Sequence, residues 1–222
     1  MMLEVIATTV DEALEIEAGG ASRIELVAAL SEGGLTPSFG LIEAVIKQVK
    51  IPVNVMIRPH SKNFIYTNDE IELMKQDIKM VSDLGANGVV FGVLTKDNEV
   101  DFKKLESLLE VCGLLEVTFH RAIDETDVVY STRALSKYGE ITTILTSGGL
   151  AAPIEQNVDL IKEMMLEAKH INILLGGGIT FNNLNALLEQ TGATHFHVGT
   201  AVRTDDDIDR EKVVQLKLKG GV

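Results

Sequence analysis

The stretch Leu3-Glu4-Val5-Ile6-Ala7-Thr8-Thr9-Val10-Asp11 opens the pattern that decides the fold. Its first five residues form a short apolar run with one carboxylate, which is typical of a buried strand. The residues after this run contain no glycine. The glycine-rich turn that binds a dinucleotide after the first strand of a doubly wound sheet is therefore absent, which argues against that fold.

Apolar runs of this kind recur along the chain at roughly even spacing, separated by longer segments with helical patterns. The eight runs are Leu3–Ala7, Arg23–Val27, Val53–Arg58, Gly88–Leu94, Leu115–His120, Thr142–Thr146, Asn172–Leu175 and His195–Gly199. Strands that alternate with helices indicate βαβ units and a parallel sheet. Because the count is eight, we predict one domain over residues 1–222, an eight-stranded parallel (β/α)8 TIM barrel. Its working face should lie at the C-terminal ends of the strands.

Capping residues mark where several of the helices should begin. Thr36-Pro37 supplies a cap residue and a proline at the first helical position. The segment Thr67-Asn68-Asp69-Glu70 has the pattern of a capping box. Asp101 and Asn157 precede two further periodic segments, and the acidic run 205–209 fits another helix start. The remaining helices are expected at 11–19, 127–138, 182–190 and 208–218.

Composition and charge narrow the class of protein. The formal net charge of −13 disfavours nucleic acid and anionic membrane surfaces as partners, because both would be repelled. No basic segment precedes an apolar one at the N-terminus, and no apolar stretch approaches the roughly 20 residues of a membrane span. We therefore expect a cytoplasmic globular protein. The only cysteine, Cys112, leaves no internal disulfide and no multi-cysteine metal cluster.

Polar and apolar residues alternate along five of the predicted strands. Side chains of a barrel strand point alternately into the lumen and out against the helices, and the outward set must be apolar. The polar set should therefore face the lumen: Glu4, Glu25, Asn54, Met56, Arg58, Glu116, Thr118, His120, His195 and His197. Such a lumen is unusual, because barrel interiors are more often filled with Val, Ile and Leu.

Buried carboxylates need partners, and Arg58 and the histidines are the candidates to compensate Glu4 and Glu25. Residues low on their strands, Glu4 among them, fit a structural network. Arg58 and His120 end their strands at the catalytic face, which favours a functional role. Glu25 and His197 lie between these layers, and both interpretations stay open for them.

Small residues follow the later strands in several loops. Glycines let backbone N–H groups approach an anion closely, and the loops after strands seven and eight often bind phosphate in this fold. The candidate anion-binding residues are Ser147, Gly148, Gly176, Gly177, Gly178 and Gly199. The alternative is that these glycines only permit sharp turns.

His120 and Asp124 are a candidate acid–base pair, since a nearby carboxylate would set the imidazole tautomer and raise its pKa. Arg58 could bind a carboxylate or phosphate with two parallel hydrogen bonds. Together with Glu25, these side chains form the candidate catalytic set.

Several segments resemble the CutC copper-homeostasis family, in the same order and along nearly the whole chain. They are Arg23-Ile24-Glu25-Leu26, Ser31-Glu32-Gly33-Gly34-Leu35-Thr36-Pro37-Ser38, Ile57-Arg58-Pro59, Gly92-Val93-Leu94-Thr95, Thr118-Phe119-His120-Arg121-Ala122, Ile144-Leu145-Thr146-Ser147-Gly148-Gly149 and Gly176-Gly177-Gly178-Ile179. The resemblance implies a β/α barrel in the cytoplasm, usually an oligomer, that handles copper(I).

The chain departs from the family pattern at two positions on the first two strands. Family members often carry cysteines there, proposed as copper ligands, and this chain has Ile6 and Val27. Copper(I) prefers thiolate and thioether ligands, and an aliphatic side chain cannot ligate. Cys112 falls at the end of a predicted helix, and Met56 is the one methionine in the lumen set. The metal ligands therefore stay unassigned.

Two functions follow from the sequence. One is a copper-homeostasis protein, from the resemblance. The other is a barrel enzyme that acts on a small anionic or phosphorylated substrate with Arg58, His120 and Asp124. The partner is in either case a small anion or a metal ion.

Overall fold

A closed ring of eight parallel strands forms the centre of the computed structural model, which describes residues 1–221. The first and last strands pair directly, with Val5 opposite Val198, and this pairing closes the barrel. The strands are β1 (Met2–Ala7), β2 (Arg23–Leu26), β3 (Val53–Met56), β4 (Gly88–Phe91), β5 (Glu116–Phe119), β6 (Ile141–Thr146), β7 (Asn172–Leu175) and β8 (His195–Val198). The predicted TIM barrel is confirmed.

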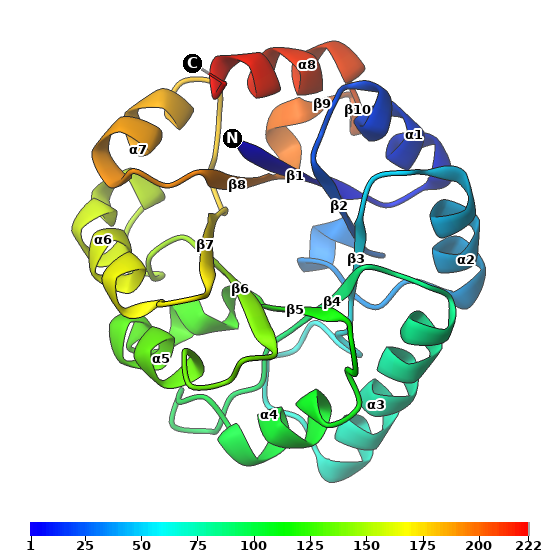
Figure 1. Ribbon diagram of the computed structural model, residues 1–222, viewed down its shortest axis with the longest axis vertical. Helices are drawn as coiled ribbons and strands as arrows, with labels where there is room; N and C mark the ends of the chain where they lie inside the picture. The colour runs from blue at the N-terminus through cyan, green and yellow to red at the C-terminus, as the bar shows by residue number, and fades with distance from the viewer. Residues whose placement is uncertain (222) are drawn as a thin grey trace.

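Eight helices alternate with the strands and form an outer ring around the barrel (Figure 1). They are α1 (Val10–Ala18), α2 (Phe39–Gln48), α3 (Asn68–Asp83), α4 (Phe102–Leu109), α5 (Val128–Leu135), α6 (Val158–Glu167), α7 (Leu184–Thr191) and α8 (Arg210–Lys219). The last helix lies beside α1, so the outer ring closes where the chain begins and ends. Across residues 1–221, no helix is long and apolar enough to cross a membrane.

Local capping chemistry explains most of the helix starts. Thr67 and Glu70 form the predicted capping box at α3, and Asp101 accepts from the backbone N–H of Lys104 at α4. The prediction for α2 is wrong by two residues, because Ser38 is its cap. Thr36 instead holds the chain beside β3, where its hydroxyl accepts from the backbone N–H of Arg58 at 2.8 Å.

The two faces of the strands bury different kinds of side chain. The outward set packs against the helices in one large apolar core, which includes Leu3, Val55 and Phe196. A second, small apolar cluster lies inside the barrel, where Val27, Met56 and Val90 pack together with Ile6 and Leu30. Leu145 also lines the pocket inside the barrel, and most of the other inward residues are polar, as the alternation predicts. The buried polar residues of this set include Glu4, Arg23, Glu25, Asn54, Arg58, Thr118, His120 and His197.

Short elements after the strands shape the C-terminal face. They are the 3₁₀ turns η1 (Leu30–Glu32), η2 (Arg121–Glu125), η3 (Ile154–Gln156) and η4 (Thr200–Val202), and the two-residue strands β9 (Arg203–Thr204) and β10 (Asp207–Ile208). The turn η2 begins directly after His120, whose side chain caps it. The backbone N–H of Ala122 in η2 thus orients the side chain of His120, the residue directly after β5.

Candidate functional site at the mouth of the barrel

Glu4 is fully buried in the lumen, and both of its carboxylate oxygens have partners. Its carboxylate accepts from Arg23 Nε at 2.5 Å and lies 2.7 Å from His197 Nδ1, while Arg23 Nη1 also reaches Glu116 at 3.3 Å. Burial alone would raise the pKa of Glu4, but the charge of Arg23 and the contact with His197 outweigh it and hold the pKa at about 2. Arg58 takes no part in this pairing, so its predicted role in compensating Glu4 is wrong.

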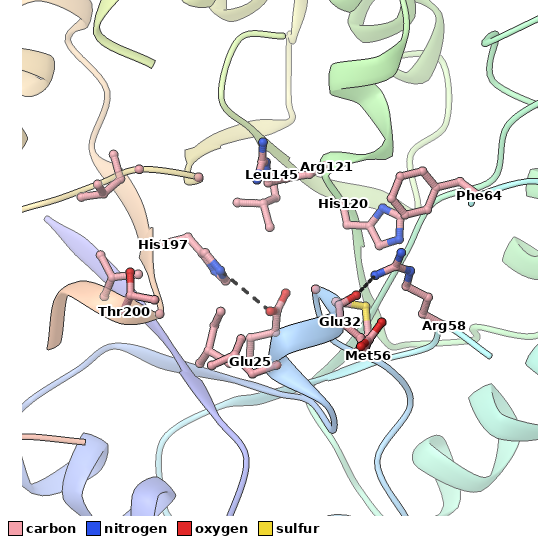
Figure 2. A pocket seen from close by; sticks show the side chains of 18 of the residues that line it. Glu25, Glu32, Met56, Arg58, Phe64, His120, Arg121, Leu145, His197 and Thr200 are labelled. Carbon is pink, nitrogen blue, oxygen red and sulfur yellow. Dashed lines mark hydrogen bonds and ion pairs between the residues drawn. The ribbon is translucent and has the colours of Figure 1, made fainter. Parts of the chain in front are cut away.

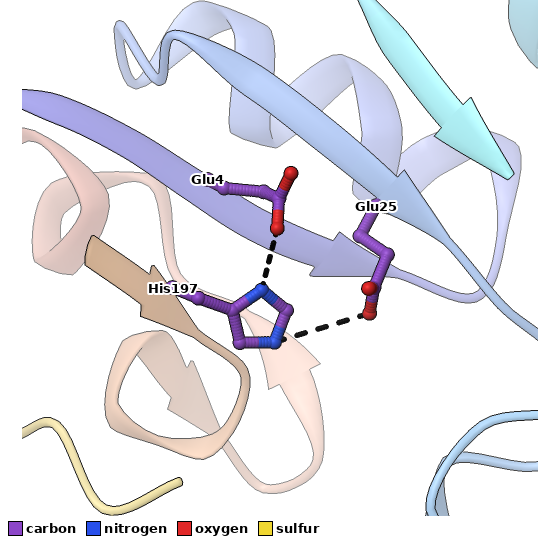
Figure 3. A group of neighbouring side chains, drawn as sticks. All are labelled: Glu4, Glu25 and His197. Carbon is purple, nitrogen blue, oxygen red and sulfur yellow. Dashed lines mark hydrogen bonds and ion pairs between the residues drawn. The ribbon is translucent and has the colours of Figure 1, made fainter. Parts of the chain in front are cut away.

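Glu25 is one strand away and is only loosely paired. Its Oε2 lies 3.9 Å from His197 Nε2, and its Oε1 is buried with no hydrogen-bond partner in residues 1–221 (Figure 3). Burial raises its pKa to about 7, against the attraction of His197 and with the help of the Glu4 charge. Burial would lower the pKa of His197, but Glu25 and Glu4 raise it overall. Glu25 is therefore a lumen carboxylate whose protonation changes near neutral pH.

Arg58 follows β3 and is held by backbone carbonyl groups. Its Nη1 donates to the carbonyls of Glu32 (3.1 Å) and Gly34 (3.2 Å), and its Nη2 donates to that of Ser61 (3.3 Å). The guanidinium lies over the ring of Phe64 at 4.8 Å, a cation–π geometry. Carbonyl dipoles and an aromatic face thus fix the side chain at the mouth of the barrel.

His120 does not contact Asp124, so that predicted pair is wrong. Its Nδ1 accepts from the backbone N–H of Ala122 at 3.2 Å, and its ring packs on Phe64 with the centroids 4.8 Å apart. Burial, reinforced by the charge of Arg58, lowers the pKa of His120 to about 3, so the ring is neutral at physiological pH. Its Nε2 is buried without a partner among the described residues, which costs about 1–3 kcal/mol if nothing fills the site.

Asp124 is instead held by the loop after β6. Its carboxylate accepts from the hydroxyls of Thr146 (2.5 Å) and Ser147 (2.8 Å) and from the backbone N–H groups of Ser147 (3.1 Å) and Gly149 (3.3 Å). The N–H of Gly148 donates to Thr146 Oγ1 at 2.8 Å. The predicted anion site at Ser147 and Gly148 is therefore wrong. The backbone N–H of Ser147 already donates to the Asp124 carboxylate, and that of Gly148 donates to the Thr146 hydroxyl.

The remaining glycines border a pocket of about 410 Å³ at the C-terminal face (Figure 2). Gly177, Gly178 and Gly199 line it, whereas Gly176 donates its N–H to the carbonyl of Thr146. Glycine is required at Gly177, where φ is +79° and a Cβ would lie 2.6 Å from Arg121 Cζ. The guanidinium of Arg121 therefore rests directly on this loop. Anion binding at the three lining glycines stays a prediction.

The same pocket brings together residues from seven of the eight strands or the loops that follow them, all except β4. Its lining includes Glu25, Met56, Arg58, His120 and His197. Three of the four residues of the candidate catalytic set, all except Asp124, thus share one cavity. Its size falls within the range of small-molecule sites.

Two arginines with clear roles were missed in the sequence. Arg23 lies two residues before Glu25 on the same strand, so alternation would have placed it in the lumen, but its pairing with Glu4 depends on the register between β1 and β2. Arg121 carries no such signal, because its position depends on the fold of η2, where it bridges Asp124 at 2.9 Å and Ser147 at 3.2 Å.

The side chains in the lumen that could hold a metal ion offer oxygen and nitrogen atoms. Ligand atoms of Glu4, Glu25 and His197 lie within 4.8 Å of one another, close enough to hold an ion. Cys112 lies after α4, donates to the carbonyl of Leu108, and has its pKa raised to about 12 by burial. A thiol of this kind stays protonated and is a poor metal ligand.

Comparison with known proteins matches this chain to one family over most of its length. The CutC family model matches residues 1–202. A human protein named copper homeostasis protein cutC homolog is 45% identical over 198 residues, which cover 88% of this chain and 72% of the human one. A CutC family protein from Xanthomonas axonopodis pv. citri is 40% identical over 202 residues, covering 89% of this chain and 82% of its own.

Solved structures agree with the sequence comparison. A crystal structure of CutC from Streptococcus agalactiae superposes with a TM-score of 0.85 at 33% identity and covers 91% of this chain and 100% of its own. Thiamine phosphate pyrophosphorylase from Pyrococcus furiosus superposes with a TM-score of 0.68 at 15% identity, covering 99% of this chain and 95% of its own, which shows the shared fold alone. With the family model, the identities and the barrel in agreement, the chain belongs to the CutC family.

Proposed function

We propose that the protein serves copper homeostasis in the cytoplasm, with copper(I) as a cargo bound at the inner end of the pocket. The names of the human and other relatives support the biological role. The observation that carries the location is the group of ligand atoms from Glu4, Glu25 and His197, all within 4.8 Å of one another.

The free ligand atoms in this group belong to Glu25 and His197. Glu4 is already committed to Arg23 and to His197 Nδ1, whereas Glu25 Oε1 has no partner among the described residues. Met56 lines the same pocket and offers the thioether that copper(I) favours. With no thiolate in the lining, we expect binding that is weaker and more exchangeable than at a cysteine centre.

Protons compete with the metal at this site. Both Glu25 and His197 have raised pKa values, and each must lose its proton before it can ligate. Copper affinity should therefore rise as the pH increases through neutrality. The pH range of this rise distinguishes the proposed ligands from the buried Cys112 thiol, whose pKa of about 12 leaves it protonated near neutral pH.

A copper(I) competition titration against a chelator, with elemental analysis of the purified protein, tests the proposal. We expect stoichiometric copper in the wild type and a loss of at least about tenfold in affinity for Glu25→Gln, the equivalent of 1.4 kcal/mol. Cys112→Ser is the matched control and should bind as the wild type does. Absence of copper, or a loss in Cys112→Ser but not in Glu25→Gln, would refute the proposed site.

A second candidate function is acid–base catalysis on a small anionic substrate. It is favoured by the pKa of about 7 at Glu25, because a general acid or base works best with a pKa near the operating pH. Copper-free protein whose crystals hold an anion between Arg58 and the loop 176–178 would support this function over copper handling.

A further inference from the structure

Arg58 is a buried cation without a carboxylate partner. Among residues 1–221, the hydrogen-bond acceptors of its guanidinium are the carbonyl groups of Glu32, Gly34 and Ser61, and its Nε has no partner. Arg23, by contrast, forms ion pairs with two carboxylates. Buried charges are normally paired, so the wall of the pocket at Arg58 has an unbalanced positive charge.

His120 carries a second hydrogen-bond donor that has no partner in the described part of the chain, close to Arg58. Because its Nδ1 accepts from the N–H of Ala122 and the ring is neutral, its one hydrogen resides on Nε2. That N–H is buried, has no acceptor among the described residues and belongs to a pocket-lining side chain. The ring of Phe64 packs on both His120 and Arg58 and holds the two groups side by side.

A cation and a fixed neutral N–H donor are suited to an oxygen anion and unsuited to a metal ion. A metal would need the Nε2 lone pair, and freeing it would transfer the hydrogen to Nδ1 and break the bond from Ala122. We propose that the wall formed by Arg58 and His120 binds the oxyanion group, phosphate or carboxylate, of a small molecule.

This proposal is independent of copper binding. In Figure 2, Arg58, His120 and Phe64 lie on one side of the pocket, and His197 lies on the opposite side. Acidic residues also border the pocket, namely Glu25, Glu32 and Glu125, and the whole chain carries a net charge of −13. Diffuse attraction therefore does not favour anions, and binding must come from local donors.

Heteronuclear NMR of the full chain gives the test, with inorganic phosphate and acetate as separate probes. We expect a saturable shift of the His120 Nε2–H resonance with a dissociation constant in the millimolar range, the affinity of about 4 kcal/mol that a few polar contacts supply. A response to phosphate alone identifies a phosphate site, and an equal response to acetate identifies a site for carboxylates as well. If neither probe shifts this resonance at concentrations up to about ten times the expected dissociation constant, the proposal is overturned.

Two substitutions at His120 distinguish the loss of the Nε2–H donor from a loss of local structure. His120→Asn keeps an acceptor for the N–H of Ala122, because asparagine is a good capping residue, but its side chain is too short to donate into the pocket. His120→Gln retains a donor near the position of Nε2. We expect anion binding to weaken about tenfold in His120→Asn and to stay within about threefold in His120→Gln. Unchanged binding in His120→Asn, followed through the amides of Gly177 and Gly178, would contradict the assignment.

Discussion

The lumen contains two pairs of a buried carboxylate and a buried arginine: Glu4 with Arg23, which we call the floor, and Glu25 with Arg58, which we call the mouth. Only the two residues of the floor form an ion pair with each other. Glu4 and Arg23 approach to 2.5 Å, and the pKa of Glu4 is held at about 2. Glu25 and Arg58 form no ion pair with each other, and the pKa of Glu25 is raised to about 7. His197 contacts both carboxylates, so it does not explain the difference.

The floor and the mouth therefore differ in whether the arginine lies close enough to the carboxylate to form an ion pair. At the floor both oxygens of Glu4 are paired and leave no free acceptor for a ligand, although Arg23 Nη2 is buried without a partner in residues 1–221. At the mouth, Glu25 Oε1, Arg58 Nε and His120 Nε2 are all buried without partners in residues 1–221. Buried polar atoms without a hydrogen-bond partner lower the stability of the fold, and proteins retain them chiefly where a ligand supplies the partner. We infer that the floor is structural and the mouth functional.

The largest expected difference is between the two arginines. Arg23→Met leaves the Glu4 carboxylate buried and unpaired, and we expect it to lower the free energy of unfolding by about 3–5 kcal/mol. Arg58→Met removes hydrogen bonds to carbonyls and leaves no carboxylate unpaired, so about 1–2 kcal/mol is expected. Urea denaturation at neutral pH measures both. Equal losses would remove the distinction between floor and mouth.

The two carboxylates should affect stability in opposite pH windows. The pKa of Glu25 rises from 4.5 to about 7 on folding, so its contribution is present at low pH and lost as the pH rises from 4.5 to 7. Relative to Glu25→Gln, the wild type should therefore lose on the order of 1–3 kcal/mol across that window. The pKa of Glu4 falls from 4.5 to about 2, so the corresponding difference for Glu4→Gln should appear as the pH drops below 4.5.

Unfolding curves of both variants and the wild type, recorded across this pH range, provide the check. If the Glu25→Gln difference were independent of pH between 4.5 and 7, the raised pKa would be wrong.

The smallest expected effect concerns the support of Arg58. The hydroxyl of Thr36 accepts from the backbone N–H of Arg58 at 2.8 Å. Thr36→Val removes this acceptor with little change in shape, and we expect a loss of about 1 kcal/mol in unfolding free energy. Thr36→Ser keeps the hydroxyl and serves as the control. A larger loss in the serine variant would mean that packing of the methyl group matters more than the hydrogen bond.

The barrel and the polarity of its lumen were predictable, because strand alternation is a local property of the sequence. Alternation placed Glu4 and Glu25 inside and Leu3 and Val5 outside, and both positions are confirmed. The start of α2 was misplaced because Thr36, an ordinary capping residue by type, hydrogen-bonds across to Arg58 instead.

The partners of the site residues were less predictable, because they depend on loops that meet only in the folded chain. Asp124 is four residues after His120, and this spacing suggested a pair. The turn η2 instead directs the carboxylate towards Thr146 and Ser147, more than 20 residues away in sequence. Conversely, the pairing of Glu4 with Arg23 required the register between β1 and β2, in which these residues are direct neighbours.

The central claim is that one lumen carboxylate is paired and the other is available, and an NMR titration of the glutamate side-chain carboxyl carbons tests it most directly. We predict one buried carboxyl that titrates near pH 7 and disappears in Glu25→Gln, while the signal of Glu4 stays ionised down to about pH 2. If Glu25 instead titrates at or below its ordinary value of 4.5, the distinction between a structural floor and a functional mouth is contradicted.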